Sequence, residues 1–585
     1  MSQSRLALLV QLPIPPPGPG ILEGNEPLAA AYLKLYARRQ GLENACRIEV
    51  FPPAAANVLG DQGVVHAILA RQPWLVGFTC YLWNVERTLW VVEHVRRAQP
   101  DVKIVLGGPE ITPDNQWLLQ RAAGSLGDGA PLVDYAVFGE GEVTFAELLA
   151  SLLGQGDART PIGGLWRAGE PAAPLRAPLE RLDAISSPYV EGILDVSSRR
   201  MLFETARGCR YRCKYCYYPK GESRPRQLAT EQVLANLKYA IDHDVEEVVL
   251  LDPTLNQRPD FVEFIELLRR ENPAGRLRFS AELRAEGIDR ATARLLREAG
   301  FHEVEIGLQS VEPEAWKLMG RPTNLVEFER GVRAMLDQGI EVRTDLILGL
   351  PGDTPDSIRR GIDFLASRKL CTEAQVFNLS ILPGTAFRQQ AAQLGLKHQP
   401  WPPYYAIRTP TLDVELLSCL MEEAQEAFDA EFDPLPTPQL DLFRLESDSS
   451  NGCRIDLDDA SQTGGASSLV GGSLPSLCFT LWLRSADFHG QRHRAATIID
   501  QLLGENPHTT LQVVIEPTDD PRRISEDTLG LLLAACYRSP TYLDRYYSLH
   551  PGRLLGSKRL IVVLPPDGPV DEAWRRGVAE YATLL

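Results

Sequence analysis

Three cysteines stand close together in the stretch ETARGCRYRCKYCYYPKG, which runs from residue 204 to residue 221. Cys209, Cys213 and Cys216 are separated by three residues and then by two, and Arg, Lys and Tyr fill the positions between them. Such spacing could place three cysteines on one face of a core helix. The basic and aromatic residues between them do not suit a helix core, and a glycine before and a proline after the cysteines indicate a loop.

Three thiolates on a basic loop favour a cubane [4Fe–4S] cluster, because the cluster is held by thiolates and its sulfurs carry negative charge. A zinc site would need a fourth Cys or His at short spacing, and the sequence has none there. Zinc and a structural role remain the alternatives. With three protein ligands one iron stays open and can bind a chelating substrate.

The loop resembles the signature of the radical S-adenosylmethionine (SAM) superfamily, Cys-x3-Cys-x2-Cys with an aromatic residue before the last cysteine, here Tyr215. This resemblance implies that Cys209, Cys213 and Cys216 hold the cluster and that SAM chelates the open iron. One electron, from an external donor such as flavodoxin or ferredoxin, then cleaves SAM to methionine and a 5′-deoxyadenosyl radical.

Further stretches extend the resemblance to cobalamin-dependent radical SAM enzymes over about residues 1–400. In the first domain the matching stretches are VGFTCYLWN, IVLGGPEITP and VFGEGEVTFAELL. In the second they are LLDPTLNQRPDF, FSAELRAEGID, EIGLQSVEPEAWKLMGR, TDLILGLPGDT and ILPGT. A methylthiotransferase would carry three further cysteines in the first domain, and only Cys46 and Cys80 are there.

The resemblance assigns SAM contacts to strand ends and loops of the second domain. Glu282 and Arg284 alternate along one strand and so share a face, with a structural ion pair as the alternative. A helix or turn cap is the alternative for Asp345. The full set of expected SAM contacts is Tyr215, Asp252, Thr254, Glu282, Arg284, Gln309, Asp345 and Gly384.

Cobalamin contacts are expected in three loops of the first domain. The sequence lacks the Asp-x-His-x-x-Gly motif of many corrinoid proteins, and neither His66 nor His94 stands in that context. We therefore expect no histidine on cobalt, and a lower face covered from the loop after the third strand; a simply buried Trp83 is the alternative. The expected cobalamin contacts are Thr79, Tyr81, Leu82, Trp83, Gly107, Gly108, Pro109, Gly139, Glu140 and Gly141.

Alternating strands and helices must position these residues. In the first domain, expected strands at 5–13, 46–52, 74–81, 102–110 and 133–142 predict a doubly wound parallel sheet, whose ligands lie beyond the carboxyl ends of the strands. A Gly-x-Gly-x-x-Gly motif after the first strand is missing, which argues against a nicotinamide dinucleotide. In the second domain, expected strands at 246–252, 277–283, 303–310, 342–352 and 373–382 predict a (β/α) barrel, closed or partly closed.

The predicted fold is α/β throughout, in several units. The C-terminal module holds no identifiable chemical motif, and His489 with His493 indicates a solvated helix face. A Ser-, Gly- and Asp-rich linker predicts a module that moves and can be removed without disturbing the core, with a role in handling substrate or a partner. The units are a Rossmann-like cobalamin-binding domain (1–155), a linker (156–200), a partial TIM-like radical SAM barrel (201–400), a helical extension (401–445), a flexible linker (446–476) and a small α/β module (477–585).

Composition limits the classes of protein. The formal net charge of the 585 residues is −17, which disfavours non-specific nucleic-acid binding. No signal peptide and no run long enough for a membrane span is visible, and ten cysteines do not make a disulfide scaffold. We expect a cytoplasmic protein.

The expected function is methylation of an unactivated carbon in a natural product, peptide or tetrapyrrole precursor. One SAM would supply the methyl group by way of the corrinoid, and a second would supply the radical. A non-methylating cyclisation, oxidation or rearrangement is the alternative within the enzyme class. A non-catalytic regulator that binds corrinoid or SAM is the alternative outside it.

Overall fold

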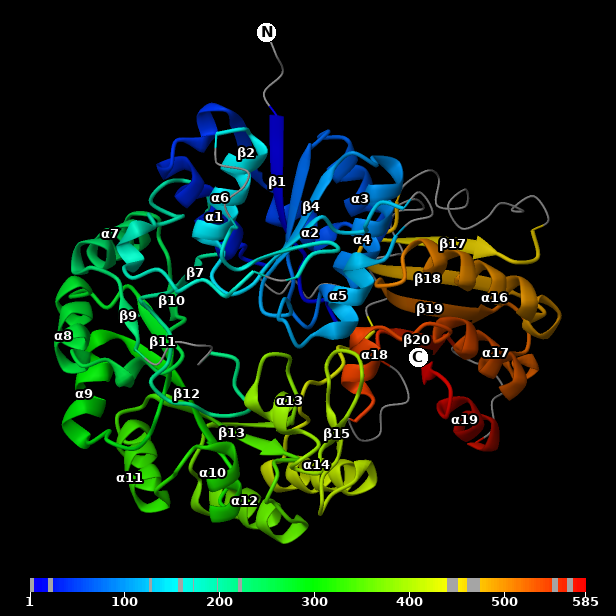
Figure 1. Cartoon of the computed structure of the whole chain (residues 1–585). Helices are drawn as coiled ribbons and strands as arrows, with labels where there is room; N and C mark the ends of the chain where they lie inside the picture. The colour runs from blue at the N-terminus through cyan, green and yellow to red at the C-terminus, as the bar shows by residue number, and fades with distance from the viewer. Residues whose placement is uncertain are drawn as a thin grey trace.

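The computed structural model describes residues 5–18, 25–125, 129–155, 161–171, 173–196, 198–218, 224–438, 451–459, 474–549, 556–564 and 572–585. The described residues form three large sheets, each flanked by helices (Figure 1), and two two-stranded ones. No helix among these residues has the length and apolar character needed to cross a bilayer.

The first sheet has the strand order β2-β1-β3-β4-β5-β6, parallel except for β6. Residues of β1 alternate between two cores: Leu8 and Val10 pack on one face of the sheet, and Ala7 and Leu9 pack on the other. Because β2 and β3 flank β1 on opposite sides, a ligand crevice is expected where the winding reverses, between β1 and β3. The elements are β1 (Arg5–Gln11), α1 (Leu28–Arg39), β2 (Cys46–Val50), α2 (Pro53–Val58), α3 (Asp61–Leu69), β3 (Leu75–Thr79), α4 (Val85–Ala98), β4 (Lys103–Gly107), α5 (Gln116–Ala123), β5 (Tyr135–Val137), α6 (Glu142–Leu152) and β6 (Leu165–Arg167).

The second sheet has six parallel strands in the order β7-β10-β11-β12-β13-β14 and does not close, because β7 and β14 do not pair. The partial barrel is confirmed. Its helices lie on the outside of the curved sheet (Figure 1). The strands are β7 (Arg200–Phe203), β10 (Glu247–Leu250), β11 (Arg278–Leu283), β12 (Phe301–Gln309), β13 (Glu341–Leu348) and β14 (Glu373–Asn378); the helices are α7 (Thr230–Asp242), α8 (Phe261–Glu271), α9 (Arg290–Ala299), α10 (Pro313–Met319), α11 (Leu325–Leu336), α12 (Pro355–Arg368) and α14 (Val414–Phe428).

Alternation along β11 separates the barrel core from the interior. Phe279, Ala281 and Leu283 belong to the core cluster shared with the helices, so Ser280 and Glu282 face the open interior. Helix α14, in the expected extension 401–445, buries Leu417, Leu420 and Met421 in the same core. Short elements complete the domain: β8 (Ala206–Arg207) with β9 (Arg226–Gln227), α13 (Ala386–Gln390), and β15 (Lys397–His398) with β16 (Ala406–Arg408).

The third sheet is parallel, in the order β17-β18-β19-β20-β21. Strand β17 lies inside the segment 446–476 that the sequence predicts to be a flexible linker, so this part of the linker is sheet instead; residues 446–450 and 460–473 lie outside the described residues. His489 and His493 are exposed on α16, in keeping with a solvated helix face. The elements are β17 (Gly452–Asp456), β18 (Cys478–Ser485), α16 (Phe488–Glu505), β19 (Thr510–Pro517), α17 (Glu526–Cys536), α18 (Tyr542–Tyr547), β20 (Lys558–Val562), α19 (Glu572–Ala579) and β21 (Thr583–Leu584).

This module is docked on the first domain rather than free to move, contrary to the expectation from the linker. The Leu477 N–H donates to the Val58 carbonyl at 2.8 Å, and the Thr510 hydroxyl donates to the Pro16 carbonyl at 2.5 Å. At the centre of the contact Asp61, fully buried, pairs with Arg87 at 2.7 Å and accepts the His508 N–H at 2.9 Å. Linker composition carries no information about such an interface, which is why the sequence missed it.

The charged state of Asp61 in its ion pair with Arg87 is stabilised in part by His508 of the C-terminal module. Burial alone would raise the pKa of Asp61, but His508 and Arg87 offset this and bring the pKa well below its ordinary value. The charged carboxylate therefore stabilises the fold above its ordinary pKa, and this contribution is lost as the pH falls toward the lowered value.

Asp61→Asn preserves shape but leaves Arg87 as a buried cation with no ion-pair partner among the described residues. We expect the first unfolding transition to lose roughly 3–5 kcal/mol in chemical denaturation. The matched control is Asp520→Asn, which breaks an exposed pair with Arg522 and should change little. Equal effects of the two substitutions would contradict the buried-pair interpretation.

Candidate active site

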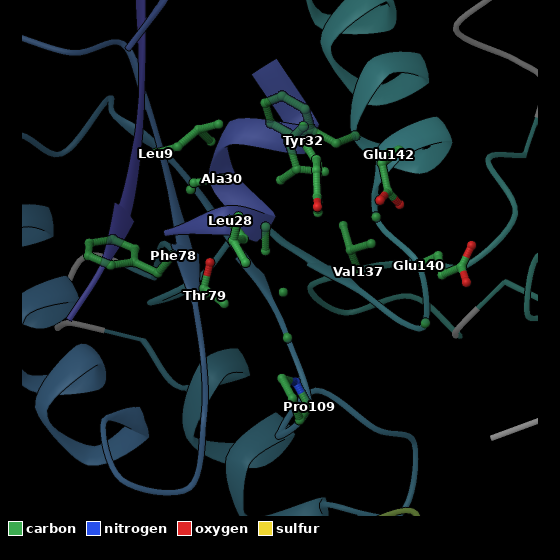
Figure 2. A pocket seen from close by; sticks show the side chains of 18 of the residues that line it. Leu9, Leu28, Ala30, Tyr32, Phe78, Thr79, Pro109, Val137, Glu140 and Glu142 are labelled. Atoms are coloured by element: carbon green, nitrogen blue, oxygen red, sulfur yellow. The ribbon is translucent and has the colours of Figure 1, made fainter. Parts of the chain in front are cut away.

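A cavity of about 340 Å³ opens at the carboxyl ends of β1, β3, β4 and β5. Figure 2 shows lining side chains of the first domain, and Glu204, Arg207, Tyr218 and Leu251 of the second domain complete the lining. Eight of the ten residues expected to contact cobalamin line this cavity: Thr79, Tyr81, Gly107, Gly108, Pro109, Gly139, Glu140 and Gly141.

Glycines shape the cavity wall. A Cβ added at Gly107 or Gly139 would meet no atom within 4 Å, so both positions border open space. Gly108 has φ +102°, and a Cβ there would lie 2.7 Å from the Cys80 carbonyl oxygen. A large flat ligand can therefore approach the backbone of these loops closely.

Leu82 and Trp83, the other two expected contacts, do not line the cavity. The Trp83 ring stacks on Tyr81 with 4.5 Å between ring centroids and 5° between planes, so Trp83 supports Tyr81 from behind. The Asn84 side chain fixes this turn by accepting the Tyr81 N–H at 2.8 Å and donating to the Leu12 carbonyl at 2.8 Å. No histidine is among the described lining residues.

Several lining residues were missed by the sequence analysis. They come from helices α1 and α6 and from the second domain, whereas Gly- and Pro-rich patterns identify only loops. Figure 2 shows Tyr32 and Glu142 beside the predicted Glu140. The missed residues with large side chains from these helices and from the second domain are Leu28, Tyr32, Leu33, Glu142, Phe145, Glu204, Arg207, Tyr218 and Leu251, and the strands add Leu9, Phe78, Val105, Leu106 and Val137.

A network of charges joins the two domains at the rim of this cavity. Arg207, two residues before the first cysteine of the loop, pairs with Glu142 of the first domain at 2.8 Å and with Glu204 at 2.9 Å. Arg226 pairs with Glu140 of the first domain. These pairs hold the approach to the cysteine loop against the wall of the cavity.

The cysteine loop is anchored through its backbone. The Gln257 side chain accepts the Arg210 N–H at 2.7 Å and donates to the Gly208 carbonyl at 3.2 Å. The Lys214 N–H donates to the Met319 carbonyl at 2.8 Å. The loop is thus held in place without the use of its cysteine side chains.

The thiols lie close enough to interact. Burial, together with the neighbouring Cys213 and Cys209, raises the pKa of Cys216 to about 12. The Arg321 guanidinium lies 4.0 Å from the Cys213 sulfur. Three clustered thiols beside a buried cation fit a metal centre, because bound metal deprotonates coordinating thiols outright. Among the described residues no group of three or more His, Cys, Asp or Glu side chains, these cysteines included, already has the spacing of a metal site.

Asp252 and Thr254 serve the cysteine loop. Asp252 is fully buried, and its carboxylate accepts the Thr205 N–H at 2.8 Å, the Ala206 N–H at 2.9 Å and the Thr205 hydroxyl at 2.5 Å. Asp252 thus holds the turn at residues 205–206 that leads into the cysteine loop, and its expected contact with SAM stays a prediction. Thr254 is buried and hydrogen-bonded to Cys209.

Arg284 also has partners within the chain. Its guanidinium pairs with Glu286 at 2.8 Å, donates to the Pro322 carbonyl at 2.9 Å and lies over the Tyr211 ring. Arg284 thus pairs with Glu286 rather than with Glu282, and its expected contact with SAM stays a prediction.

Gln309 and Asp345 have unused acceptors that fit a polar ligand. Gln309 Oε1 and Asp345 Oδ1 are buried and have no hydrogen-bond partner in the described part of the chain. Gln309 also has φ +68°, in the left-handed region, a conformation that costs free energy and is common at functional sites. Buried acceptors of this kind are normally satisfied, so a ligand with donors is implied.

Glu282 and Arg321 lie close to Asp345 in the interior of the second sheet. Glu282 lies opposite Glu305 across β11 and β12, and burial together with Glu305 raises the pKa of Glu282 to about 7, while Arg321 opposes the shift. Arg321 is buried and donates to the Gly307 carbonyl at 2.6 Å. Sequence reasoning missed Arg321, although it ends the stretch KLMGR, because no spacing rule ties it to the cysteines. Tyr215 packs beside it, near Cys213.

Gly384 lies in the loop after β14, and its N–H donates to Asp114 of the first domain at 2.9 Å. The two domains therefore touch at two places: around Arg207, and between this loop and Asp114.

Two family models match the chain: that of the radical SAM superfamily over residues 203–365, and that of the B12 binding domain over residues 24–149. Among curated proteins, the cobalamin-dependent radical SAM methyltransferase TokK of Streptomyces tokunonensis is 28% identical over 423 residues, which is 68% of this chain and 60% of TokK. The 2-(S-pantetheinyl)-carbapenam-3-carboxylate methyltransferase of Streptantibioticus cattleyicolor is 28% identical over 424 residues, with the same shares. The chain thus spans about three fifths of these relatives.

Among solved structures, the radical SAM methyltransferase TsrM from Kitasatospora setae, with cobalamin and a [4Fe–4S] cluster bound, superposes with a TM-score of 0.53 at 21% identity. The superposition covers 68% of this chain and 76% of TsrM. It supports the fold described above.

Glu282→Gln should flatten the pH dependence of stability of the ligand-free protein. Because the pKa of Glu282 is raised on folding, its contribution to stability is full below the ordinary glutamate pKa and is lost as the pH rises through about 7. Glutamine does not titrate, so the melting temperature should fall less between about pH 5 and about pH 8 than in the wild type. Glu415→Gln, at an exposed position in the first turn of α14, is the control. An unchanged slope for Glu282→Gln would show that the carboxylate does not titrate in this range.

Proposed function

We propose that this chain, a radical SAM protein with a B12-binding domain, is a cobalamin-dependent methyltransferase that acts on an unactivated carbon of a natural-product precursor. The observation that carries the proposal is the shared cavity: the glycine loops of the B12-binding domain and the residues leading into the cysteine loop line the same space. Methyl transfer through two cofactors needs them face to face, and this arrangement provides it. When bound, the corrinoid would carry the methyl group, while the cluster with SAM would supply the radical.

Different residues would hold the cluster and SAM. Cys209, Cys213 and Cys216 hold the cluster, and Arg321 offsets negative charge beside them. Gln309 and Asp345 offer their unused acceptors to the hydroxyl and ammonium donors of SAM.

The corrinoid side is built from backbone and apolar contacts. Gly107 and Gly139 let the flat ligand approach, and Tyr81, braced by Trp83, closes the loop beneath it. No histidine is among the described lining residues, so this wall would offer a bound corrinoid tyrosine and backbone contacts rather than an imidazole.

The substrate is proposed to be a small molecule, since the two relatives above are named as a radical SAM methyltransferase and as a methyltransferase of a carbapenam carboxylate. The same cofactors can also drive a non-methylating reaction. Product analysis separates the two in anaerobic protein given hydroxocobalamin, SAM and a low-potential reductant. Methyl transfer yields S-adenosylhomocysteine that depends on added cobalamin, together with 5′-deoxyadenosine. Formation of 5′-deoxyadenosine alone would favour the non-methylating reaction. If neither product forms, a non-catalytic regulator is favoured.

Changing Cys209, Cys213 and Cys216 together to Ala should remove the cluster. Reconstituted wild type should hold about four irons per chain and an oxygen-sensitive visible absorbance, and the triple variant neither. Cobalamin binding should persist, because its loops lie in the other domain. Cys419→Ala, at an exposed position in α14, is the matched control. Full iron in the triple variant would refute the assignment.

We also propose that an acidic electron donor such as flavodoxin or ferredoxin docks at the cysteine loop. Arg210 and Arg212 are exposed and Lys214 is half-buried, and none of the three forms an ion pair with a described residue. Three cations that have no ion-pair partner in the described part of the chain form a local positive surface beside the cluster site, on a chain of net charge −17. Such a surface steers association with a negatively charged partner.

Arg210→Gln with Arg212→Gln should raise the KM for flavodoxin as the donor several-fold and weaken its dependence on salt. SAM cleavage driven by a chemical reductant, and iron content, should stay at the wild-type level. The control is Arg575→Gln with Arg576→Gln, which removes the same charge from the exposed face of α19. An equal effect of both double variants would mean that net charge, rather than this surface, governs the encounter.

A further inference from the structure

Residues 110–117 of the B12-binding domain, here called the strap, contact the second domain at the loop around Gly384. Asp114 accepts the Gly384 N–H with one carboxylate oxygen at 2.9 Å, and the other oxygen accepts the Thr112 hydroxyl at 2.6 Å. Gly384 has φ +77°, so its loop is held in a conformation that few other residues adopt. Asp114 thus uses both oxygens to fix one loop relative to the other.

The strap makes a second contact through Tyr404. This tyrosine is fully buried; its hydroxyl donates to Glu110 at 2.6 Å and accepts the Trp117 indole N–H at 3.1 Å. The Tyr404 carbonyl in turn accepts the Ile381 N–H at 2.9 Å. Glu110 directly follows Pro109, which lines the cavity. The strap therefore runs from the wall of the corrinoid cavity to both sides of the Gly384 loop.

From this loop the contacts continue to the cysteines. The Thr385 hydroxyl caps α13 by accepting the Arg388 N–H at 3.2 Å. In the same helix the Phe387 N–H donates to the carbonyl of Lys214, between Cys213 and Cys216, at 3.0 Å. Hydrogen bonds connected by short stretches of backbone thus join the glycine loop at Pro109 to the cysteine loop.

We infer that this strap couples the two cofactor sites, with Asp114 as a positioning residue that preorders the Gly384 loop for SAM when the corrinoid occupies its cavity. The inference rests on the proposed function, which places SAM at that loop. A corrinoid against Gly107–Pro109 orders the residues that precede the strap, and a loop that is already ordered loses less conformational entropy when it binds a ligand. Coupling of this kind is reciprocal, so SAM must tighten corrinoid binding by the same factor.

A purely local role for Asp114 is the competing explanation. The residue stands just before α5, where a negative charge stabilises the helix N-terminus. Asp114→Asn separates the two roles, because its amide oxygen still accepts the Gly384 N–H while the charge is lost. Asp114→Ala removes both.

The experiment measures SAM binding to the anaerobic full-length chain with and without saturating hydroxocobalamin. In the wild type and in Asp114→Asn, we expect cobalamin to tighten SAM binding roughly 5-fold or more. In Asp114→Ala this ratio should approach one. Asp413→Ala is the matched control, because Asp413 also accepts a backbone N–H, from Leu416 at 3.0 Å, at the start of α14; it should lower the melting temperature and leave the ratio intact.

Tyr404→Phe tests the second contact if Asp114→Ala does not fold. It removes only the hydroxyl between Glu110 and Trp117, and the ratio should fall in this variant too. Wild-type coupling in folded Asp114→Ala or in Tyr404→Phe overturns the inference. Loss of coupling in Asp114→Asn as well would assign the effect to the charge at α5 and also overturn it. A wild type that binds both ligands without coupling refutes the inference alone, whereas one that binds neither refutes the proposed function.

Discussion

The ion pairs of Arg207 are the contact on which the rest of the site depends. One guanidinium bridges Glu142, at the start of α6, and Glu204, at the end of β7. Each of these groups would be costly to bury alone, because a desolvated charge needs a partner. The two domains therefore satisfy their charges only when they face each other across the cavity, and the glycine loops then lie opposite the approach to the cysteines.

Much of the architecture could be predicted from the sequence, because apolar strands that alternate with amphipathic helices leave few topologies. The glycine loops were found for the same reason: a ligand crevice of a doubly wound sheet lies at its strand ends. Asp252 and Asp345 show where this reasoning stops. Asp252 follows the barrel strand β10 and Asp345 lies within β13, yet Asp252 accepts the N–H groups of Thr205 and Ala206, while Asp345 keeps an oxygen without a described partner. Residue type is alike in the two cases, and only the surrounding chain decides how the oxygens are used.

Contacts made by helices and by distant segments escaped sequence reasoning for a related reason. Tyr32 lines the cavity from α1, and Arg321 reaches Cys213 from the end of α10, with no local signature in either case. Strand β17 was not predicted, because it lies in a stretch whose Ser, Gly and Asp content is typical of linkers. Composition describes what a segment does alone, whereas β17 forms because β18 offers it an edge to pair with.

The contact between His508 and Asp61 can form only late in the synthesis of the chain. These two residues are separated by 447 positions, so the first domain leaves the ribosome long before the module that covers its buried aspartate. At ordinary rates of synthesis this delay is on the order of tens of seconds. During that interval the surface around α3 and α4 is uncovered, and Asp61 has Arg87 but not His508 as a partner.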